Sequence, residues 1–381
     1  MKSIAVFGST GSIGKQTLSV CAAHPDEFSV LAVVFGANTA LGTEQINAFR
    51  PKLVGVYDET AAKEIRSRFP GLEVVSGSEV WDIASCGEID TAVNGVSGFN
   101  GIFPLIAALK AGKTVALANK ESVVCAGELV DKAKEAGGGT IIPVDSEQSA
   151  IFQCLSAGRR EDVKRLILTA SGGAFRKLNA KQLREVSPEM AMKHPNWSMG
   201  KKITIDSSTL FNKGLEVMEA AYLFGASADE IKVLIHPQSI VHSMVEFRDN
   251  SVSAQLSVPD MRLAIQYALT YPLRLECPAA ALDLAALGSL EFEEPDGERF
   301  PALPMAYRAL REGGSLPVAY NSGNEVAVER FVKGEIRFDE IAGCVEYVMD
   351  KIEHCSIFGL DMLLYCDSQA RRLAKEYKAM R

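Results

Sequence analysis

The sequence lacks the features that mark membrane, secreted and nucleic-acid-binding proteins. Its 381 residues contain no run of about 18 apolar residues, the length that a transmembrane helix needs. Residues 2–8 already have the pattern of a β-strand, so we expect no signal peptide. No long basic run is present, and 40 Lys and Arg stand against 48 Asp and Glu, for a formal net charge of −8. We therefore expect no membrane partner and no nucleic-acid partner.

The sequence also lacks paired cysteines. Its 8 cysteines are scattered, and none forms a C-x-x-C pair. This spacing favours buried free thiols in a reducing compartment over disulfides or a zinc site, so we expect a cytoplasmic protein. Apolar residues make up 47% of the chain and charged residues 23%, as in soluble globular proteins. A chain of this length buries a sizeable core without covalent cross-links.

The pattern of apolar residues divides the chain into four parts. In residues 1–145, short apolar runs alternate with helical stretches, which predicts an α/β domain with a doubly wound parallel sheet. Residues 146–270 contain four more predicted strands, in a central α+β domain with a mobile lid loop at about 188–201. Residues 271–300 are rich in Pro, Ala and Leu and indicate a connector. Apolar residues three or four apart predict a small helical domain over 301–381.

A glycine-rich turn follows the first predicted strand. Residues 8–14 (GSTGSIG) have the spacing G-x-x-G-x-x-G, a variant of the dinucleotide-binding fingerprint, and a helical pattern comes next. Glycines let the backbone approach a ligand, and the N–H groups at a helix N-terminus bind anions. The alternative is a purely structural turn. After the second strand, residues 35–38 (FGAN) lack the acid that NAD sites place there, which favours NADP.

Carboxylates follow the last strand of the first domain. Asp145 and Glu147 are two apart, so in an extended segment they share one face at the carboxyl end of the sheet. Such oxygen ligands suit Mg²⁺ or Mn²⁺, and a solvated acidic loop is the alternative. A third ligand could come from a later predicted helix that carries Glu216 and Glu219. Periodicity does not choose between these two, and a surface role is open to both.

Hydroxyl and amide groups in the central domain suggest a second anion site. Ser171 precedes two glycines after a predicted strand, and residues 206–209 (DSST) stand just before a predicted helix that carries Asn212 and Lys213. N-cap and turn roles are the alternative for the hydroxyls. Residues 194–200 (HPNWSMG) could form a lid that closes an aromatic ring and a His over substrate, or pack locally.

Taken together, these segments resemble the 1-deoxy-D-xylulose 5-phosphate reductoisomerase family, and they run in the family's order through the first 270 residues. The later residues 324–326 (NEV) fit as well. The matching motifs are residues 8–14 (GSTGSIG), 117–122 (LANKES), 143–148 (PVDSEQ), 171–173 (SGG), 194–200 (HPNWSMG), 206–216 (DSSTLFNKGLE), 236–243 (HPQSIVHS) and 259–262 (PDMR).

The resemblance implies a reductoisomerase of non-mevalonate isoprenoid biosynthesis, an NADPH- and metal-dependent homodimer that turns 1-deoxy-D-xylulose 5-phosphate into 2-C-methyl-D-erythritol 4-phosphate. The implied metal ligands are Asp145, Glu147 and Glu216, which favours Glu216 over Glu219. The implied substrate-binding residues are Lys120, Ser146, Glu147, Ser171, His194, Trp197, Ser207, Asn212, Lys213 and Glu216. The implied NADPH-binding residues are Thr10, Gly11, Ser12, Ile13, Gly36, Ala37, Asn38, Asn119, Glu121, Gly200 and Met261. The candidate catalytic residues are Lys120, Glu147 and His194.

Two positions depart from the family pattern. Ala37 stands where some relatives carry Lys, so a positive contact to the 2′-phosphate of NADP is missing there. Residues 321–324 (NSGN) replace a more usual Asn-Ala-Ala-Asn, which we expect to change only a turn. Two alternative functions are compatible with the same first domain. One is an ordinary NADP-dependent dehydrogenase of a phosphorylated small molecule, and the other is a non-catalytic NADP-responsive binding protein.

Overall fold

A computed structural model describes residues 1–192 and 200–378. The chain divides into two compact units that are each built from separated segments. Unit 1 comprises Met1–Ser122, Glu128–Ser149 and Asp260–Ala280, and unit 2 comprises Val123–Gly127, Ala150–Pro259 and Ala281–Arg381. The finer division at residues 145, 270 and 300 stays a prediction.

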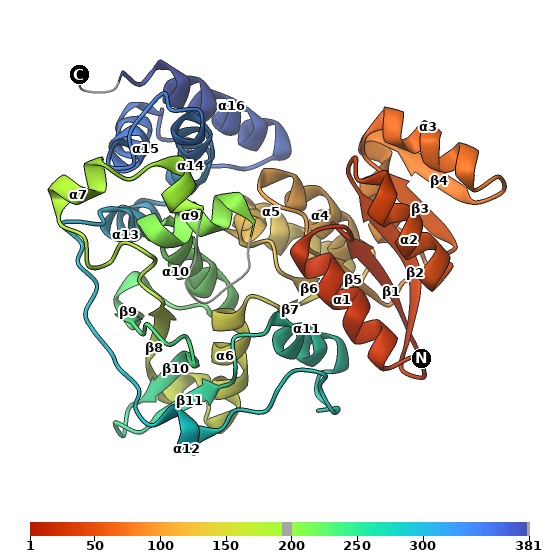
Figure 1. The fold of residues 1–381 in the computed structure, drawn as a ribbon, viewed down its shortest axis with the longest axis horizontal. Helices are drawn as coiled ribbons and strands as arrows, with labels where there is room; N and C mark the ends of the chain where they lie inside the picture. Colours follow the sequence, from red (N-terminus) through yellow and green to blue (C-terminus); the bar gives the residue numbers. More distant parts are fainter. Residues whose placement is uncertain (193–199, 379–381) are drawn as a thin grey trace. The chain divides into compact units, whose positions relative to one another are not determined.

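Unit 1 contains a seven-stranded sheet in the order β4-β3-β2-β1-β5-β6-β7 (Figure 1). Every neighbouring pair of strands is parallel, and helices connect successive strands. The strands are β1 (Lys2–Phe7), β2 (Phe28–Phe35), β3 (Leu53–Val56), β4 (Glu73–Ser76), β5 (Thr91–Asn94), β6 (Thr114–Leu117) and β7 (Thr140–Pro143). The helices are α1 (Ser12–Ala23), α2 (Thr39–Phe49), α3 (Glu59–Arg68), α4 (Ile102–Lys110), α5 (Lys120–Gly137) and α11 (Met261–Thr270). This arrangement confirms the predicted doubly wound sheet.

The strand order reverses at β1, because β2 lies on one side of it and β5 on the other. In open parallel sheets, ligands bind in the crevice outside the carboxyl ends of the strands at such a reversal. The glycine-rich turn follows β1 directly and therefore stands at this point. The sheet positions the turn by burying β1 completely from Ile4 to Phe7.

Helix α11 adds a distant segment to the core of unit 1. Its Ile265 and Leu269 side chains are fully buried in the same cluster as Ile4 and Val33. The Nζ atom of Lys2 also donates a hydrogen bond to the carbonyl oxygen of Leu269 (2.8 Å). Although α11 falls within the range expected for the central domain, its apolar face therefore belongs to unit 1. The start of this helix carries Met261, one of the expected cofactor neighbours.

Unit 2 contains a four-stranded sheet in the order β11-β10-β8-β9. Strand β10 is antiparallel to β8 and to β11, whereas β8 and β9 are parallel. The strands are β8 (Val163–Ala170), β9 (Ile231–Ile235), β10 (Val241–Phe247) and β11 (Val252–Leu256). The four strands expected in the central region all form, and together they make a mixed sheet.

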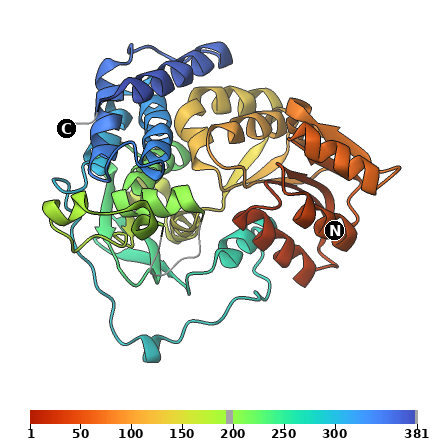
Figure 2. The same ribbon diagram turned by 45° about the horizontal axis from the view of Figure 1, so that its top comes forward.

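Helices make up most of the rest of unit 2. They are α7 (Ala180–Arg184), α8 (Pro188–Ala191), α9 (Lys201–Thr209), α10 (Phe211–Phe224), α12 (Leu284–Leu287), α13 (Ala302–Glu312), α14 (Leu316–Val332), α15 (Glu340–Lys351) and α16 (Leu360–Glu376). Helix α14 packs against α15 and α16, and Figure 2 shows these three helices side by side in blue. Helix α6 (Ser146–Cys154) begins in unit 1 and ends in unit 2. In the described part of the chain, no helix is both long enough and apolar enough to cross a membrane.

The predicted lid at about 188–201 is only partly described. His194 and Trp197 lie outside the described residues. The two described ends of the segment are helical, because α8 covers Pro188–Ala191 and α9 begins at Lys201. Gly200, an expected cofactor neighbour, is exposed and forms the N-cap of α9.

Candidate active site

The glycine-rich turn holds the start of α1 close to the end of β1. Gly8 has a φ of +78°, a conformation that glycine adopts without strain. A Cβ atom at Gly14 would lie 2.3 Å from the carbonyl oxygen of Gly8, so only glycine lets the helix approach the turn this closely. Gly11 is the N-cap of α1 and has no side chain with which to cap it. The first N–H groups of α1 are therefore available to an anion.

The residues around this turn offer an open face. Gly11 and Ser12 are exposed, and Thr10 and Ile13 are half-buried. At the end of β2, the stretch from Gly36 to Asn38 is exposed, and Asn38 caps α2 by accepting a hydrogen bond from the N–H of Leu41 (3.2 Å). These residues all belong to unit 1, and their role in binding a cofactor stays a prediction.

Asn119 has a structural task that the sequence did not reveal. Its amide nitrogen donates to the carbonyl oxygens of Val96 and Gly98, each at 2.8 Å, and to Glu121 (3.0 Å). Its Oδ1 atom accepts from the N–H of Ser122 (3.0 Å) and so caps α5. The side chain of Asn119 thus ties the loop after β5 to the start of α5, and the same contacts place Glu121.

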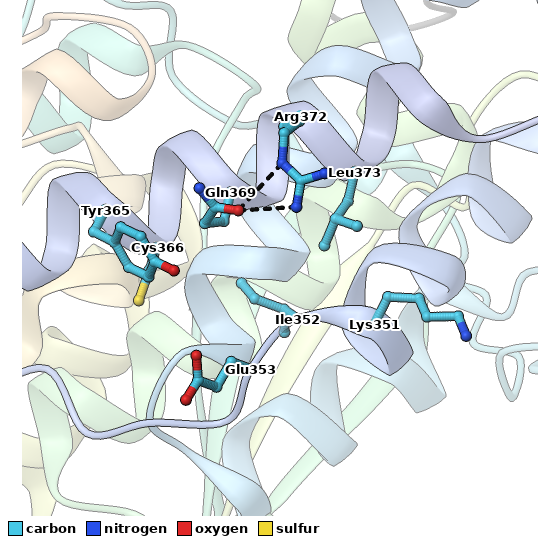
Figure 3. A pocket seen from close by; sticks show the side chains of 8 residues that line it. All are labelled: Lys351, Ile352, Glu353, Tyr365, Cys366, Gln369, Arg372 and Leu373. Carbon is cyan, nitrogen blue, oxygen red and sulfur yellow. Dashed lines mark hydrogen bonds between the residues drawn. The ribbon is translucent and has the colours of Figure 1, made fainter.

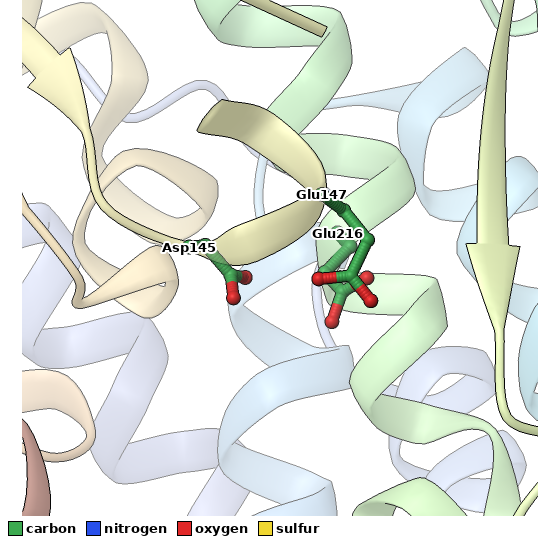
Figure 4. Close-up of side chains that lie close together, drawn as sticks. All are labelled: Asp145, Glu147 and Glu216. Atoms are coloured by element: carbon green, nitrogen blue, oxygen red, sulfur yellow. The ribbon is translucent and has the colours of Figure 1, made fainter. Parts of the chain in front are cut away.

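Three carboxylates lie together. Asp145 follows β7, Glu147 lies in the first turn of α6, and Glu216 lies on α10 (Figure 4). Each side chain offers one oxygen, and these oxygens all lie within 4.8 Å of one another. Six oxygen ligands at about 2.1 Å around Mg²⁺ are about 3.0 to 4.2 Å apart, so small side-chain adjustments bring these oxygens to one ion. The donor set is hard and anionic, as Mg²⁺ and Mn²⁺ require.

Glu219 lies one turn after Glu216 on α10 and is fully buried. Among the residues that the structure describes, it does not take part in the carboxylate group. Periodicity could not choose between the two glutamates, because both flank the apolar face of α10. The structure brings Glu216, and not Glu219, together with Asp145 and Glu147 among the described residues.

Two buried ammonium groups contact these carboxylates. Lys120 Nζ lies 2.5 Å from an oxygen of Asp145, and both side chains are largely buried. Lys213 pairs with Glu216 on the same helix, and both are almost completely buried. A buried charge is costly without a partner, so each lysine offsets part of the repulsion within the acidic group. Ser146 donates its hydroxyl to Glu147 (2.5 Å).

Hydroxyl groups in unit 2 lie where the sequence suggested an anion site. The hydroxyl oxygens of Ser171 and Ser207 are 3.5 Å apart, and the N–H of Gly173 donates to Ser171 (3.2 Å). A Cβ atom at Gly173 would lie 2.5 Å from the Cα of Ser208, so this glycine lets the loop after β8 reach α9. Asn212 opens α10 and donates to Glu216.

The segment that carries Ser207 differs from its expected form. We expected residues 206–209 just before a helix, but they form the last residues of α9. Leu210 then takes a left-handed conformation, with φ 64° and ψ 10°, and joins α9 to α10. The helical conformation is interrupted at this strained residue, and Asn212 and Lys213 therefore lie in a second helix that runs in a new direction.

A buried contact holds the end of α9 and was missed by sequence reasoning. The amide of Asn324 on α14 donates to Asp206 (2.8 Å), and Lys202 donates to the other carboxylate oxygen (2.6 Å). Asp206 is 2% exposed and Asn324 is fully buried. The only signal in the sequence was the unusual presence of Asn in the apolar pattern of α14.

Comparison with known proteins identifies the family. The family model for 1-deoxy-D-xylulose 5-phosphate reductoisomerase matches residues 4–127. The model for the 1-deoxy-D-xylulose 5-phosphate reductoisomerase C-terminal domain matches residues 141–224, and the model for the DXP reductoisomerase C-terminal domain matches residues 256–373. The enzyme of that name from Pelotomaculum thermopropionicum is 50% identical over 98% of this chain and 97% of its own length. The chain belongs to the 1-deoxy-D-xylulose 5-phosphate reductoisomerase family.

Solved structures of reductoisomerases agree with this assignment. The Zymomonas mobilis 1-deoxy-D-xylulose 5-phosphate reductoisomerase in complex with NADPH is 38% identical, with a TM-score of 0.92 over 98% of both chains. A DOX-P reductoisomerase in complex with NADPH, fosmidomycin and magnesium is 37% identical, with a TM-score of 0.92 over 99% of this chain and 98% of that one. Since relatives match over the full length, an ordinary dehydrogenase and a non-catalytic binding protein are set aside.

Proposed function

We propose that this reductoisomerase converts 1-deoxy-D-xylulose 5-phosphate to 2-C-methyl-D-erythritol 4-phosphate, with NADPH and Mg²⁺ or Mn²⁺, in the non-mevalonate route to isoprenoids. The observation that carries the proposal is the close approach of Asp145, Glu147 and Glu216 in a chain of this family. A simple hydride transfer needs no divalent cation, whereas moving a carbon skeleton through an enolate does benefit from one.

Asp145, Glu147 and Glu216 would hold the divalent cation. A bound cation supplies Lewis-acid polarisation of the substrate's ketone and of the adjacent hydroxyl oxygen. Lys120 is held beside Asp145 and would direct its ammonium group at the substrate's oxygens. Ser146 would donate to the substrate from the start of α6. Lys120 Nζ and the carboxylate of Glu147 are the candidate positions at which a proton is held during the rearrangement.

The glycine-rich turn and the end of β2 would bind the coenzyme. NADPH supplies the hydride that reduces the rearranged aldehyde. The N–H groups at the start of α1 would bind its pyrophosphate, and Thr10, Gly11, Ser12 and Ile13 would surround it. Gly36, Ala37 and Asn38 would contact the adenosine end. Asn119, Glu121, Gly200 and Met261 would complete the site.

Ser171, Ser207, Asn212 and Lys213 would bind the substrate's phosphate. Support comes from the short distance between the two serine hydroxyls and from the position of Lys213 on the first turn of α10. The phosphate is remote from the carbons that react, so its binding energy can orient the substrate and close a lid. His194 and Trp197 would belong to that lid, with His194 as a further candidate catalytic residue.

We also propose a homodimer in the cytoplasm. The homodimer follows from the family alone. The cytoplasmic location is supported by the eight cysteines, all of which are free thiols in the structure. Free thiols persist in compartments that are kept reducing.

The substitution Glu216→Gln tests the metal assignment. It removes the charge of one ligand with little change in shape, so Mn²⁺ affinity and turnover should both fall while NADPH affinity persists. Calorimetry measures the affinity for Mn²⁺, and quenching of protein fluorescence by NADPH measures the affinity for NADPH. The control is Glu329→Gln. Glu329 is an exposed residue of α14 that pairs with Lys333, so this variant should behave as the unaltered enzyme. Full Mn²⁺ affinity in Glu216→Gln would reject the assignment.

A further inference from the structure

Three sulfur atoms meet at the C-terminal end of unit 2, and none of them belongs to a residue assigned above. The Sγ atom of Cys355 lies 3.5 Å from Sγ of Cys366 and 4.0 Å from Sδ of Met362. Met362 and Cys366 are four residues apart on α16 and so share one face of that helix. Cys355 lies in the segment that follows α15.

The spacing of these sulfurs suits one small soft metal ion. With metal–sulfur bonds of about 2.3 Å, sulfur atoms around a trigonal or tetrahedral ion are about 3.8 to 4.0 Å apart. The two observed distances, 3.5 and 4.0 Å, bracket that spacing closely. Two thiols and one thioether are the donors that select Cu(I) over hard cations. The carboxylate group of the active site selects in the opposite sense.

The sulfur cluster is buried at one side and accessible at the other. Cys366 is 1% exposed, whereas Met362 is 39% exposed and Cys355 is half-buried. Cys366 also lines a hollow of about 210 Å³ beside Lys351 and Arg372 (Figure 3). An ion can therefore arrive from the side of Met362. Glu353 lines the same hollow, and its negative charge opposes a thiolate at Cys366, so the metal ion itself must supply the compensating positive charge.

We propose that Cys355, Cys366 and Met362 form a binding site for Cu(I). Binding joins two thiols and one Cu⁺ into a bis-thiolate complex and releases two protons to solvent, with no change of oxidation state. Each thiol gives up its proton when it binds the ion, so binding strengthens as pH rises. The thioether of Met362 adds a neutral third ligand. The bound ion would tie the segment after α15 to α16.

Competition for Cu(I) tests the site. The full-length protein, with Mg²⁺ and NADPH present, is titrated anaerobically into the coloured Cu(I) complex of bicinchoninate, and the loss of colour reports transfer. We expect one Cu(I) per chain to be withdrawn. Cys355→Ser should withdraw none, and Met362→Leu should bind at least about tenfold more weakly, as even changes beyond the ligands do. Cys277→Ser, which removes a thiol from unit 1, should match the unaltered protein.

Three results would overturn the proposal. The first is failure of the unaltered protein to withdraw Cu(I) from the chelator. The second is unchanged stoichiometry and affinity for Cu(I) in Met362→Leu. This variant keeps the apolar volume of the side chain, so it tests the site even if Cys355→Ser does not fold. The third is a mass lower by two hydrogen atoms without copper, which would mean that Cys355 and Cys366 had been oxidised to a disulfide instead.

Discussion

Leu210 carries backbone strain at the centre of the proposed phosphate site. It lies between Ser207 and Asn212, with φ 64° and ψ 10°, and it is 3% exposed. A side chain in the left-handed region costs about 1–2 kcal/mol, because its Cβ approaches the backbone. The buried leucine side chain offsets that cost, so packing holds the turn that starts α10 in its direction.

Replacing Leu210 by Gly and by Ala separates strain from packing. Both variants lose the buried side chain and should be less stable than the unaltered protein. Leu210→Gly should nevertheless be more stable than Leu210→Ala by about 1 kcal/mol, since only Ala keeps the strained Cβ. Urea denaturation measures the difference. Equal stabilities, or a more stable alanine variant, would show that the backbone at 210 is not strained.

The contact between Asn324 and Asp206 gives a second prediction for single residues. Asn324→Ala leaves one oxygen of a buried carboxylate without its donor, which should lower the free energy of unfolding by about 1–3 kcal/mol. Because Asp206 lies in the last turn of α9, the helix that carries Ser207, KM for the substrate should rise while NADPH affinity stays the same. A double-mutant cycle with Asp206→Ala isolates the pair. A coupling energy near zero would contradict a role for this bond.

Among the elements, α11 depends on the ion pair at its start. Asp260 accepts from the N–H of Arg262 (2.9 Å) and pairs with the guanidinium of the same residue (2.5 Å). The hydrogen bond from that guanidinium holds the pKa of Asp260 below its ordinary value of 3.8. A lowered pKa means that this stability is present above pH 3.8 and is lost as pH falls through the folded-state pKa.

Two variants of Asp260 separate the cap from the charge. Asparagine also caps helices, so Asp260→Asn should lose only the ion pair, and Asp260→Ala should cost about 1 kcal/mol more. In Asp260→Asn the loss of stability below pH 3.8 should be smaller than in the unaltered protein. Thermal unfolding between pH 7 and pH 3 measures both effects. Parallel pH profiles for the three proteins would contradict the linkage.

Elements with a strong local pattern could be predicted from the sequence. The strands of the parallel sheet are short apolar runs that end at turn residues, and the central strands β1, β2 and β5 are almost wholly buried, so the pattern indicated strands. The place of α11 in the core of unit 1 could not be predicted, because it depends on packing between distant segments. The helical form of residues 206–209 was also hidden, since DSST is typical of caps as well as of helix ends.

At the scale of the whole molecule, the group formed by the three carboxylates could not be predicted from local sequence pattern alone. Spacing predicted that Asp145 and Glu147 lie together on an extended segment, but this premise was wrong, because Glu147 lies in the first turn of α6. The choice of Glu216 rested on family resemblance. The fold then brought the three oxygens within 4.8 Å of one another. The resemblance placed Lys120 and Lys213 among the substrate-binding residues, yet their burial against these carboxylates could not be predicted from one sequence, because it arises from tertiary packing.

Anomalous diffraction from crystals soaked with Mn²⁺ and NADPH tests the central claim most directly, because manganese identifies itself by its absorption edge. We expect one strong peak at about 2.1–2.3 Å from an oxygen of each of Asp145, Glu147 and Glu216, the distance of a hard divalent cation from its oxygen ligands. A peak at another place, or none at saturating Mn²⁺, would contradict the claim that these carboxylates hold the metal.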